Sequence, residues 1–321
     1  MKRSSWFSTV FLPICLSAGL TIAAAAARVT AQTQPFDDLK EKFLKEVEGA
    51  KRRIAKNPND AHEHYRLGGF YVKLYQFQDA VAAYSQALQL KPDFAYAHYD
   101  LGWCYTRMGN YKEALNAHRE AEKHIQITSF KLRLTGEEVN YAIGWDLYAL
   151  RRYDEAIAHY LKAVQLNPKY QSAVYEIGRI HLRQGDQEGV QQIAHKLDPY
   201  LRELLFKEIE ILKSTEKGGA ADDPNLLSVK ADSESRPTIL YREKGQYTSM
   251  ARDHMIEGTV ILSVVYAANE KITGVRVLRE LPYGLTAQAL IAMQKIRFKP
   301  AMKDSKPISI RGGLEFGFNI Y

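Results

Sequence analysis

The sequence GTVILSVVYA, from Gly258 to Ala267, decides the fold of the C-terminal part of this 321-residue chain. It is rich in β-branched and aromatic residues, and after a polar turn at 268–271 a similar run, ITGVRVLRE, extends from Ile272 to Glu280. Two such runs joined by a short turn predict a β-hairpin. A third strand is predicted near the C-terminus, where apolar residues occupy alternate positions: Ile308, Ile310, Leu314, Phe316, Phe318 and Ile320.

Between the hairpin and the third strand, apolar residues recur at the spacing of one helix face: Leu285, Ala289, Ala292, Met293 and Ile296. A helix laid across one side of an antiparallel three-stranded sheet would bury both apolar faces. The last strand would then run antiparallel to the first and lie at the edge of the sheet. Its unpaired main-chain N–H and C=O groups could be completed by another extended chain.

The edge of this last strand is the predicted partner-binding site of the C-terminal domain. Its residues are Ile308, Ser309, Ile310, Arg311, Gly312, Gly313, Leu314 and Glu315. The alternative is an edge that binds nothing, because basic residues and Pro307 blunt it. Its glycines either permit close approach of a partner backbone or mark a bulge.

Several motifs in this region resemble the C-terminal domain of TonB-type proteins. They are Tyr247–Thr248, Ala251–Arg252, Ile256–Val260, Arg276–Val277, Leu281–Leu285, Ala289, Arg297–Ala301 and Lys306–Pro307. The resemblance covers nearly all of 236–321 and implies periplasmic binding, in which the edge strand pairs with a short extended segment of an outer-membrane receptor. The chain departs from the family at the hairpin turn, where Asn269 and Glu270 replace the usual glycine. Because glutamate tolerates positive φ poorly, a weaker turn is expected.

The middle of the chain is an internal repeat. Leu67–Gly68 recurs 34 residues later as Leu101–Gly102, and again as Ile143–Gly144 and Ile177–Gly178. The step between the second and third copies exceeds this period by eight residues, so an inserted loop is predicted near 129–136. A repeat of this length and pattern resembles the tetratricopeptide repeat, in which each unit is a pair of antiparallel helices. Small residues let the paired helices approach, and units must stack in order to bury their apolar faces.

The predicted fold is a multidomain one: an all-α solenoid of tetratricopeptide repeats, followed by a small α+β domain of the TonB type. In chain order, the predicted segments are a signal peptide at 1–31, a capping helix at 36–58, the solenoid at 61–213, a flexible linker at 214–235 and the C-terminal domain at 236–321. The repeats are predicted at 61–94, 95–128, 137–170 and 171–213, the last of them degenerate. A linker of this composition is expected to span roughly 25 Å and to separate the two domains.

The N-terminus has the features of a secretory signal. Lys2 and Arg3 precede an uncharged run from Trp6 to Ala27, and small residues follow at 29–31. The run is also long enough to span a bilayer, so an inner-membrane anchor facing the periplasm is the alternative. Cleavage would leave a periplasmic protein with Cys104 as its only cysteine, and therefore no intrachain disulfide.

The charge is basic overall, at +7, and residues 236–321 carry thirteen basic and seven acidic side chains. Such a surface either attracts anionic partners such as cell-wall polymer or is simply solvated. No nucleic-acid partner is predicted, and membrane contact is predicted only through an uncleaved N-terminal segment.

Tyrosine, tryptophan and arginine recur at positions that face the concave groove in the repeat family. These predicted groove residues are Tyr65, Tyr96, Tyr99, Trp103, Arg107, Tyr141, Trp145, Tyr148, Tyr175, Arg179 and Arg183. Such side chains are typical of binding hot spots, because they bury a large area and keep a polar tip. The alternative is that the aromatic residues pack between helices as ordinary core. The family's peptide-carboxylate clamp is not matched, so a free C-terminal peptide is not the expected ligand.

The sequence contains no recognisable catalytic, metal-binding or cofactor-binding motif, so neither an enzyme nor a cofactor is predicted. The predicted protein binds one protein partner in its repeat groove and an outer-membrane receptor through its C-terminal strand, in connection with TonB-dependent transport. One alternative is a structural scaffold of a cell-envelope complex, which could form a homodimer by strand exchange. The other is a membrane-anchored energy transducer, if the N-terminal segment is retained.

Overall fold

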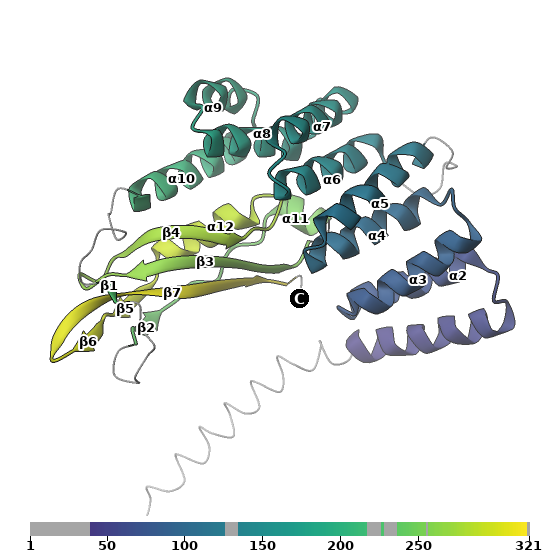
Figure 1. The fold of residues 1–321 in the computed structure, drawn as a ribbon, viewed down its shortest axis with the longest axis horizontal. Helices are drawn as coiled ribbons and strands as arrows, with labels where there is room; N and C mark the ends of the chain where they lie inside the picture. Colours follow the sequence, from purple (N-terminus) through teal and green to yellow (C-terminus); the bar gives the residue numbers. More distant parts are fainter. Residues whose placement is uncertain (1–38, 126–133, 217–225, 228–235, 255, 320–321) are drawn as a thin grey trace, which may run out of the picture. The chain divides into compact units, whose positions relative to one another are not determined.

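The computed structural model describes residues 39–125, 134–216, 226–227, 236–254 and 256–319 (Figure 1). The predicted signal peptide, the inserted loop at 126–133 and most of the predicted linker lie outside these residues. The chain divides into two compact units, one up to Leu90 and one from Lys91 onward. Among the described residues, no helix has both the length and the apolar character needed to cross a membrane.

The first unit contains a helix over 39–56 and the antiparallel pair α2 (Ala61–Lys73) and α3 (Phe77–Leu90). Asp60 begins α2, because its side chain accepts hydrogen bonds from the first backbone amides of the helix. The pair packs closely at Gly68, where an added Cβ would lie 2.5 Å from the Tyr84 ring. The absence of a side chain at Gly68 is therefore what lets the two helices approach.

The helical part of the second unit repeats the same arrangement. Its helices are α4 (Ala95–Met108), α5 (Tyr111–His124), α6 (Gly136–Ala149), α7 (Tyr153–Leu166), α8 (Gln171–Gln184), α9 (Gln187–Ala194) and α10 (Pro199–Glu216). At Gly144 an added Cβ would lie 2.7 Å from the Tyr160 ring, and at Gly102 it would lie 2.4 Å from the His118 ring. The repeat glycines predicted from the sequence are thus the contact points of the helix pairs.

The C-terminal domain is a sheet with one main helix packed on it, which confirms the predicted fold class. Strands β3 (Gly258–Tyr266), β4 (Ile272–Arg279) and β7 (Lys306–Phe318) form the antiparallel core of the sheet, in the order β4, β3, β7. The helix α12 (Leu285–Gln294) lies in the connection between β4 and β7 (Figure 1). The hairpin turn places Glu270 at φ 65°, as the missing glycine led us to expect.

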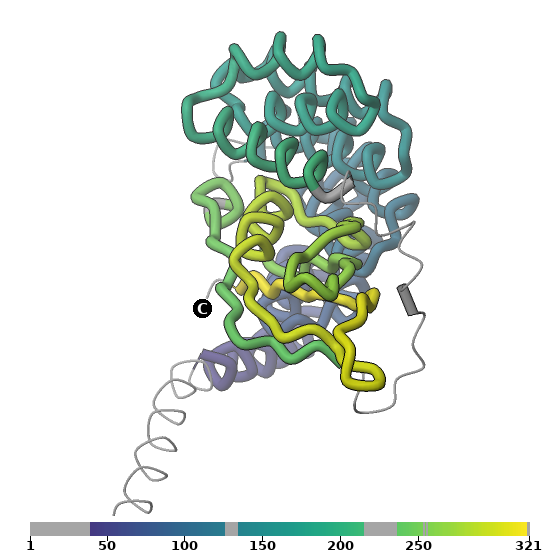
Figure 2. The backbone as a smooth tube through the Cα atoms, turned by 90° about the vertical axis from the view of Figure 1, so that its left-hand side faces the viewer, coloured from purple at the N-terminus to yellow at the C-terminus, as the bar shows by residue number. Residues whose placement is uncertain are grey.

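Shorter elements extend this core beyond the predicted three strands. They are α11 (Ser249–Asp253), β1 (Leu226–Leu227), β2 (Thr238–Tyr241), β5 (Arg297–Lys299) and β6 (Ala301–Lys303). Strands β1 and β6 pair with β7, whereas β2 and β5 form a separate two-stranded sheet. The side view shows the C-terminal domain directly beneath the helices of 134–216 (Figure 2). Helix α10 packs against both α12 and β4.

Candidate interaction sites

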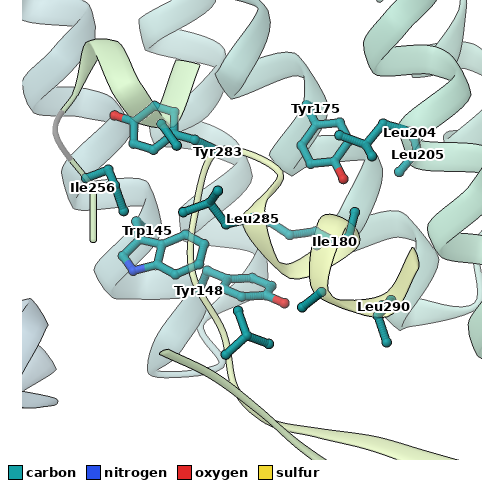
Figure 3. Close-up of a cluster of buried hydrophobic side chains, with 14 of the residues drawn as sticks. Trp145, Tyr148, Tyr175, Ile180, Leu204, Leu205, Ile256, Tyr283, Leu285 and Leu290 are labelled. Carbon is teal, nitrogen blue, oxygen red and sulfur yellow. The ribbon is translucent and has the colours of Figure 1, made fainter. Parts of the chain in front are cut away.

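Most of the predicted groove residues of α6 and α8 lie inside a hydrophobic core. Five side chains predicted to line the groove are at most 6% exposed: Tyr141, Trp145, Tyr148, Tyr175 and Arg179. The four aromatic ones belong to one continuous core with Tyr283, Leu285 and Leu290 of the C-terminal domain. Figure 3 shows Trp145, Tyr148 and Tyr175 in this core. The groove formed by α6 and α8 is therefore filled by the chain itself.

The segment that fills it is the loop between β4 and α12, from Glu280 to Gly284. The Tyr283 ring stacks on Tyr141, with centroids 4.5 Å apart, and on His254 at 4.4 Å. The loop is tightly bent, with Tyr283 at φ 59° and Gly284 at φ 80°. A Cβ at Gly284 would lie 2.8 Å from Leu204 of α10, so a larger residue there would collide with the repeat helices.

A buried charge cluster joins the same loop to the repeats. Arg179 of α8 donates hydrogen bonds to Glu176 at 2.8 Å, to Glu208 of α10 at 3.1 Å and to Glu280 of the loop at 2.7 Å. Glu280 also accepts a hydrogen bond from Tyr148 Oη at 2.7 Å and forms an ion pair with Arg183. We call these charged groups (Glu176, Arg179, Arg183, Glu208 and Glu280) the Arg179 cluster.

The cluster is shielded from water, which strengthens the interactions within it. The side chains of Arg179, Glu176 and Glu208 are at most 4% exposed, and that of Glu280 is 16% exposed. Burial raises the pKa of Glu176, and the nearby Arg179 opposes that rise. Burial acts to lower the pKa of Arg179, but the carboxylates of Glu208 and Glu176 outweigh this and hold it well above its ordinary value. Arg179 therefore stays charged, and removal of a carboxylate would leave it less well compensated.

The predicted groove residues of α4 also lie against the C-terminal domain or inside their own repeat. Arg107 donates a hydrogen bond to the main-chain oxygen of Glu257 at 3.4 Å, and Arg279 donates one to the main-chain oxygen of Arg107 at 3.2 Å. Tyr96 accepts a hydrogen bond from the backbone N–H of Leu134 at 3.1 Å. Arg107 therefore joins this helix to the C-terminal domain, whereas Tyr96 fixes the residue that leads into α6.

Three other predicted groove residues pack against the second helix of their own repeat. The Tyr99 and Trp103 rings lie 5.5 Å and 5.6 Å from the His118 ring. In the first unit, the Tyr65 ring lies 5.6 Å from the Tyr84 ring. These contacts agree with the alternative interpretation, in which the aromatic residues are part of the core.

The structure thus differs from the expectation of an open groove and a domain set apart from it. Glu280, Tyr283 and Glu208 were not predicted as groove-site residues, although Glu280 and Tyr283 lie within or beside the motif Leu281–Leu285 used for the family resemblance. The sequence did contain a signal for this contact: the acidic residue Glu280 directly precedes the apolar motif Leu281–Leu285. Together they complement the arginine and aromatic residues of the groove.

The second candidate site is the edge of β7, and one end of it is covered. Strand β3 pairs with β7 along its length, from Tyr266 opposite Ile310 to Gly258 opposite Phe318. Strand β6 pairs with 306–308, and on the side opposite to β3 the strand β1 lies parallel to Ser309 and Ile310. Of the predicted partner-binding residues, Ile308, Ser309 and Ile310 are therefore flanked by the chain itself, which corrects the prediction for these three.

From Arg311 to Phe318, the described residues pair with β7 only through β3. Leu314, Phe316 and Phe318 anchor this stretch, because each is 2% exposed and points into the core. The remaining predicted residues, from Arg311 to Glu315, thus lie on an edge that pairs on one side only among the described strands. The strands β1, β2, β5 and β6 gather at the other end of β7 (Figure 1).

Two kinds of known domain match the chain. The C-terminal domain of Gram-negative bacterial TonB proteins matches residues 243–320, and tetratricopeptide repeats match residues 71–122 and 144–185. The protein is a tetratricopeptide-repeat protein with a TonB-type C-terminal domain. The matched C-terminal region contains both the Glu280–Gly284 loop and the β7 edge.

Solved structures with a similar fold are helical-repeat proteins. A crystal structure of MamA is 20% identical, covers 50% of this chain and 88% of that chain, and has a TM-score of 0.45. The structure titled MamA 41-end from Desulfovibrio magneticus RS-1 is 18% identical and has a TM-score of 0.42; the match covers 59% of this chain and 97% of that one. YrrB, described as a tetratricopeptide-repeat protein with an unusual peptide-binding site, is 20% identical and has a TM-score of 0.43; the match covers 54% of this chain and 86% of that one. Such likeness concerns the fold alone, and no curated protein matches the chain.

The two domain families support a protein-interaction role at the envelope of a Gram-negative bacterium. Both are interaction modules without catalytic function of their own. In the described part of the chain, no group of three or more His, Cys, Asp or Glu side chains is arranged to hold a metal ion.

Proposed function

We propose that this is an exported periplasmic protein whose β7 edge captures an extended segment of an outer-membrane receptor by strand addition, in connection with TonB-dependent transport. The pairing of β1 with β7 is the observation that carries the proposal. A segment of the chain itself adds as a parallel strand beside Ser309 and Ile310. The edge therefore accepts an added strand at this end, and Arg311–Phe318 continues it.

Main-chain pairing along such an edge supplies affinity, and the side chains beside it supply specificity. Each main-chain hydrogen bond contributes roughly 0.5–1.5 kcal/mol net, so several are needed to offset the ordering of a short peptide. Because Leu314, Phe316 and Phe318 fix β7 in the core, the edge is already extended before a partner arrives. This preorganisation lowers the cost of binding.

In this proposal, the repeat groove of the second unit holds the TonB-type domain and does not capture a separate ligand. The Arg179 cluster and the stacked Tyr283 ring supply the charged and aromatic contacts that a groove of this composition is suited to make. Residues Tyr141, Trp145, Tyr148, Tyr175, Arg179 and Arg183 then act as the binding site for the Glu280–Gly284 loop.

A photocrosslinking amino acid at position 315 of the full chain tests strand addition in cells. Glu315 lies on the open part of β7 and is exposed. Glu155 provides the matched control, because its side chain is 52% exposed on α7. We expect light-dependent adducts from position 315, mapped by mass spectrometry to one short segment of an outer-membrane receptor. Indistinguishable adducts from positions 315 and 155, or none from 315, would overturn the proposal.

The proposed export depends on residues 1–31, and cell fractionation with N-terminal sequencing tests it. A mature chain that starts near Gln32 in the periplasm supports cleavage and excludes direct force transmission through an N-terminal anchor. A retained N-terminus in the inner membrane supports the energy-transducer alternative instead.

A further inference from the structure

The outward face of the open β7 segment has two positions without side chains. Gly313 and Gly317 are both exposed, and a Cβ added at either would meet no other atom within 4 Å. Gly312, on the opposite face, differs, because a Cβ there would lie 2.9 Å from the Tyr266 ring. Close packing within the chain therefore does not require glycine at 313 or 317.

The neighbouring strand continues this face without covering the glycines. Ser263 of β3 lies opposite Gly313, Ile261 opposite Glu315 and Thr259 opposite Gly317, and all three β3 residues are half-buried. The two glycines are four residues apart and lie on the same face of the strand. A strand added beside β7 would place every second side chain on this face.

Glu315 lies between the two glycines and carries the charge of this face at the edge. It is exposed, and no hydrogen bond or ion pair of its side chain is found among the described residues. The nearby Arg311 reaches across the sheet instead, because its guanidinium donates to Ser263 Oγ at 3.4 Å and to the main-chain oxygen of Gly274 at 3.3 Å. Its charge thus points away from the open edge, and Glu315 is left to face an added strand.

We propose that the captured segment carries large apolar side chains, best aromatic ones, at two positions four residues apart, with a basic residue midway between them. This inference rests on the proposed strand addition and names the partner's side-chain pattern. Large side chains would lie over Gly313 and Gly317, where an aromatic ring shields bare glycine backbone from water. The basic residue would pair across the strands with Glu315. The same pattern applies to parallel and antiparallel addition, because side chains alternate in both.

Synthetic peptides binding to the full chain test this pattern. The probe is a peptide of about eight residues with tryptophan at its second and sixth positions, lysine at the fourth and threonine elsewhere. Its binding is measured by fluorescence anisotropy. We expect about a tenfold loss of affinity when both tryptophans become alanine. We expect about a fivefold loss when the lysine becomes glutamate.

Substitutions in the protein test the same contacts from the other side. Gly313→Gln and Gly317→Gln place long neutral side chains where the rings would lie, and their Cβ atoms have room. Each substitution is expected to weaken binding of the probe about threefold, because it affects one of the two ring positions. Leu278→Gln on β4 is the matched control, since Leu278 is 65% exposed and two strands away from the open edge. The Glu315→Lys variant is expected to bind the lysine-containing probe about fivefold more weakly and to regain affinity for the peptide in which glutamate replaces that lysine.

Backbone-methylated peptides separate this inference from the strand addition on which it rests. Two peptides are compared, one N-methylated at its odd-numbered residues and the other at its even-numbered residues. Only the peptide whose methylated N–H groups would face β7 should lose its main-chain pairing. If one register abolishes binding but the side-chain changes leave affinity within about twofold, strand addition stands and the proposed pattern is wrong. If no probe binds, or if neither methylated register weakens binding, both proposals are wrong.

Discussion

Replacing Glu280 by alanine tests whether the Arg179 cluster holds the C-terminal domain in the groove. The substitution removes an acceptor from Arg179 at 2.7 Å, an acceptor from Tyr148 at 2.7 Å and the ion-pair partner of Arg183. Removing one partner of a buried ion pair costs about 3–5 kcal/mol. Arg179 keeps Glu176 and Glu208, so we expect the lower end of that range, about 3 kcal/mol. This corresponds to a shift of roughly two orders of magnitude in the docking equilibrium.

Amide hydrogen exchange on the full chain measures this shift segment by segment. In the Glu280→Ala variant, we expect the amides of 281–290 and of α8 to exchange up to about a hundredfold faster, because they lose protection whenever the domain undocks. Calorimetry should resolve separate unfolding transitions for the repeats and the C-terminal domain. Glu280→Gln keeps the shape and some of the hydrogen bonds, so its effect should lie between wild type and alanine.

Glu155→Ala is the matched control for this experiment. Glu155 forms two hydrogen bonds with Arg152, both at 2.7 Å, but the pair is exposed on the surface of the repeats. Such a pair contributes about 0–1 kcal/mol, so exchange and melting should change little. If Glu280→Ala behaves like Glu155→Ala in both measurements, the Arg179 cluster does not hold the domain, and the groove needs another explanation.

Further predictions concern the repeats. Gly68→Ala should destabilise the chain by about 1–3 kcal/mol in urea unfolding, because its Cβ would lie 2.5 Å from the Tyr84 ring of α3. Gly69→Ala should be neutral or stabilising, because its Cβ would lie 3.9 Å from the Tyr84 hydroxyl. His118→Leu should cost about 3 kcal/mol in the same assay, since it leaves Asp146 buried without its partner at 2.6 Å. Burial raises the pKa of Cys104 to about 12, so its thiol should resist alkylation at pH 8 until the chain unfolds, and rapid labelling of a native chain lacking the other cysteine would contradict this.

Most of the fold could be predicted because its signals are local and periodic. Alternate residues of the last strand, such as Leu314 and Phe316, are buried as their period of two requires. The repeat glycines were recognisable because helix pairs can approach closely only where a side chain is missing, as at Gly68 and Gly144. These features depend on neighbouring residues or on one repeated unit, and both are visible in a single sequence.

The occupant of the groove could not be predicted by the same reasoning. Composition indicates that a face carrying Tyr148 and Arg179 is suited to binding, but not whether its ligand belongs to the same chain. The predicted length of the linker favoured separated domains, yet any covalent connection also keeps the C-terminal domain at high local concentration near the groove. Glu280 then completes a charge cluster whose other members lie about 70 to 100 residues away in the sequence. These groups come together only in the folded chain.

Docking also determines which outer strand of the sheet lies against the repeats. The antiparallel core of the sheet has two outer strands, β4 and β7, and an uncovered outer strand invites association with any extended chain. Helix α10 packs against β4 and α12, and the loop that follows β4 is held in the groove. With α10 packed against β4, the stretch Arg311–Phe318 of β7 is the part of the described outer strands that pairs on one side only and faces away from α10. Undocking by Glu280→Ala should therefore free β4 as a second pairing edge, so we expect that variant to self-associate through β4 while probe binding at β7 stays unchanged.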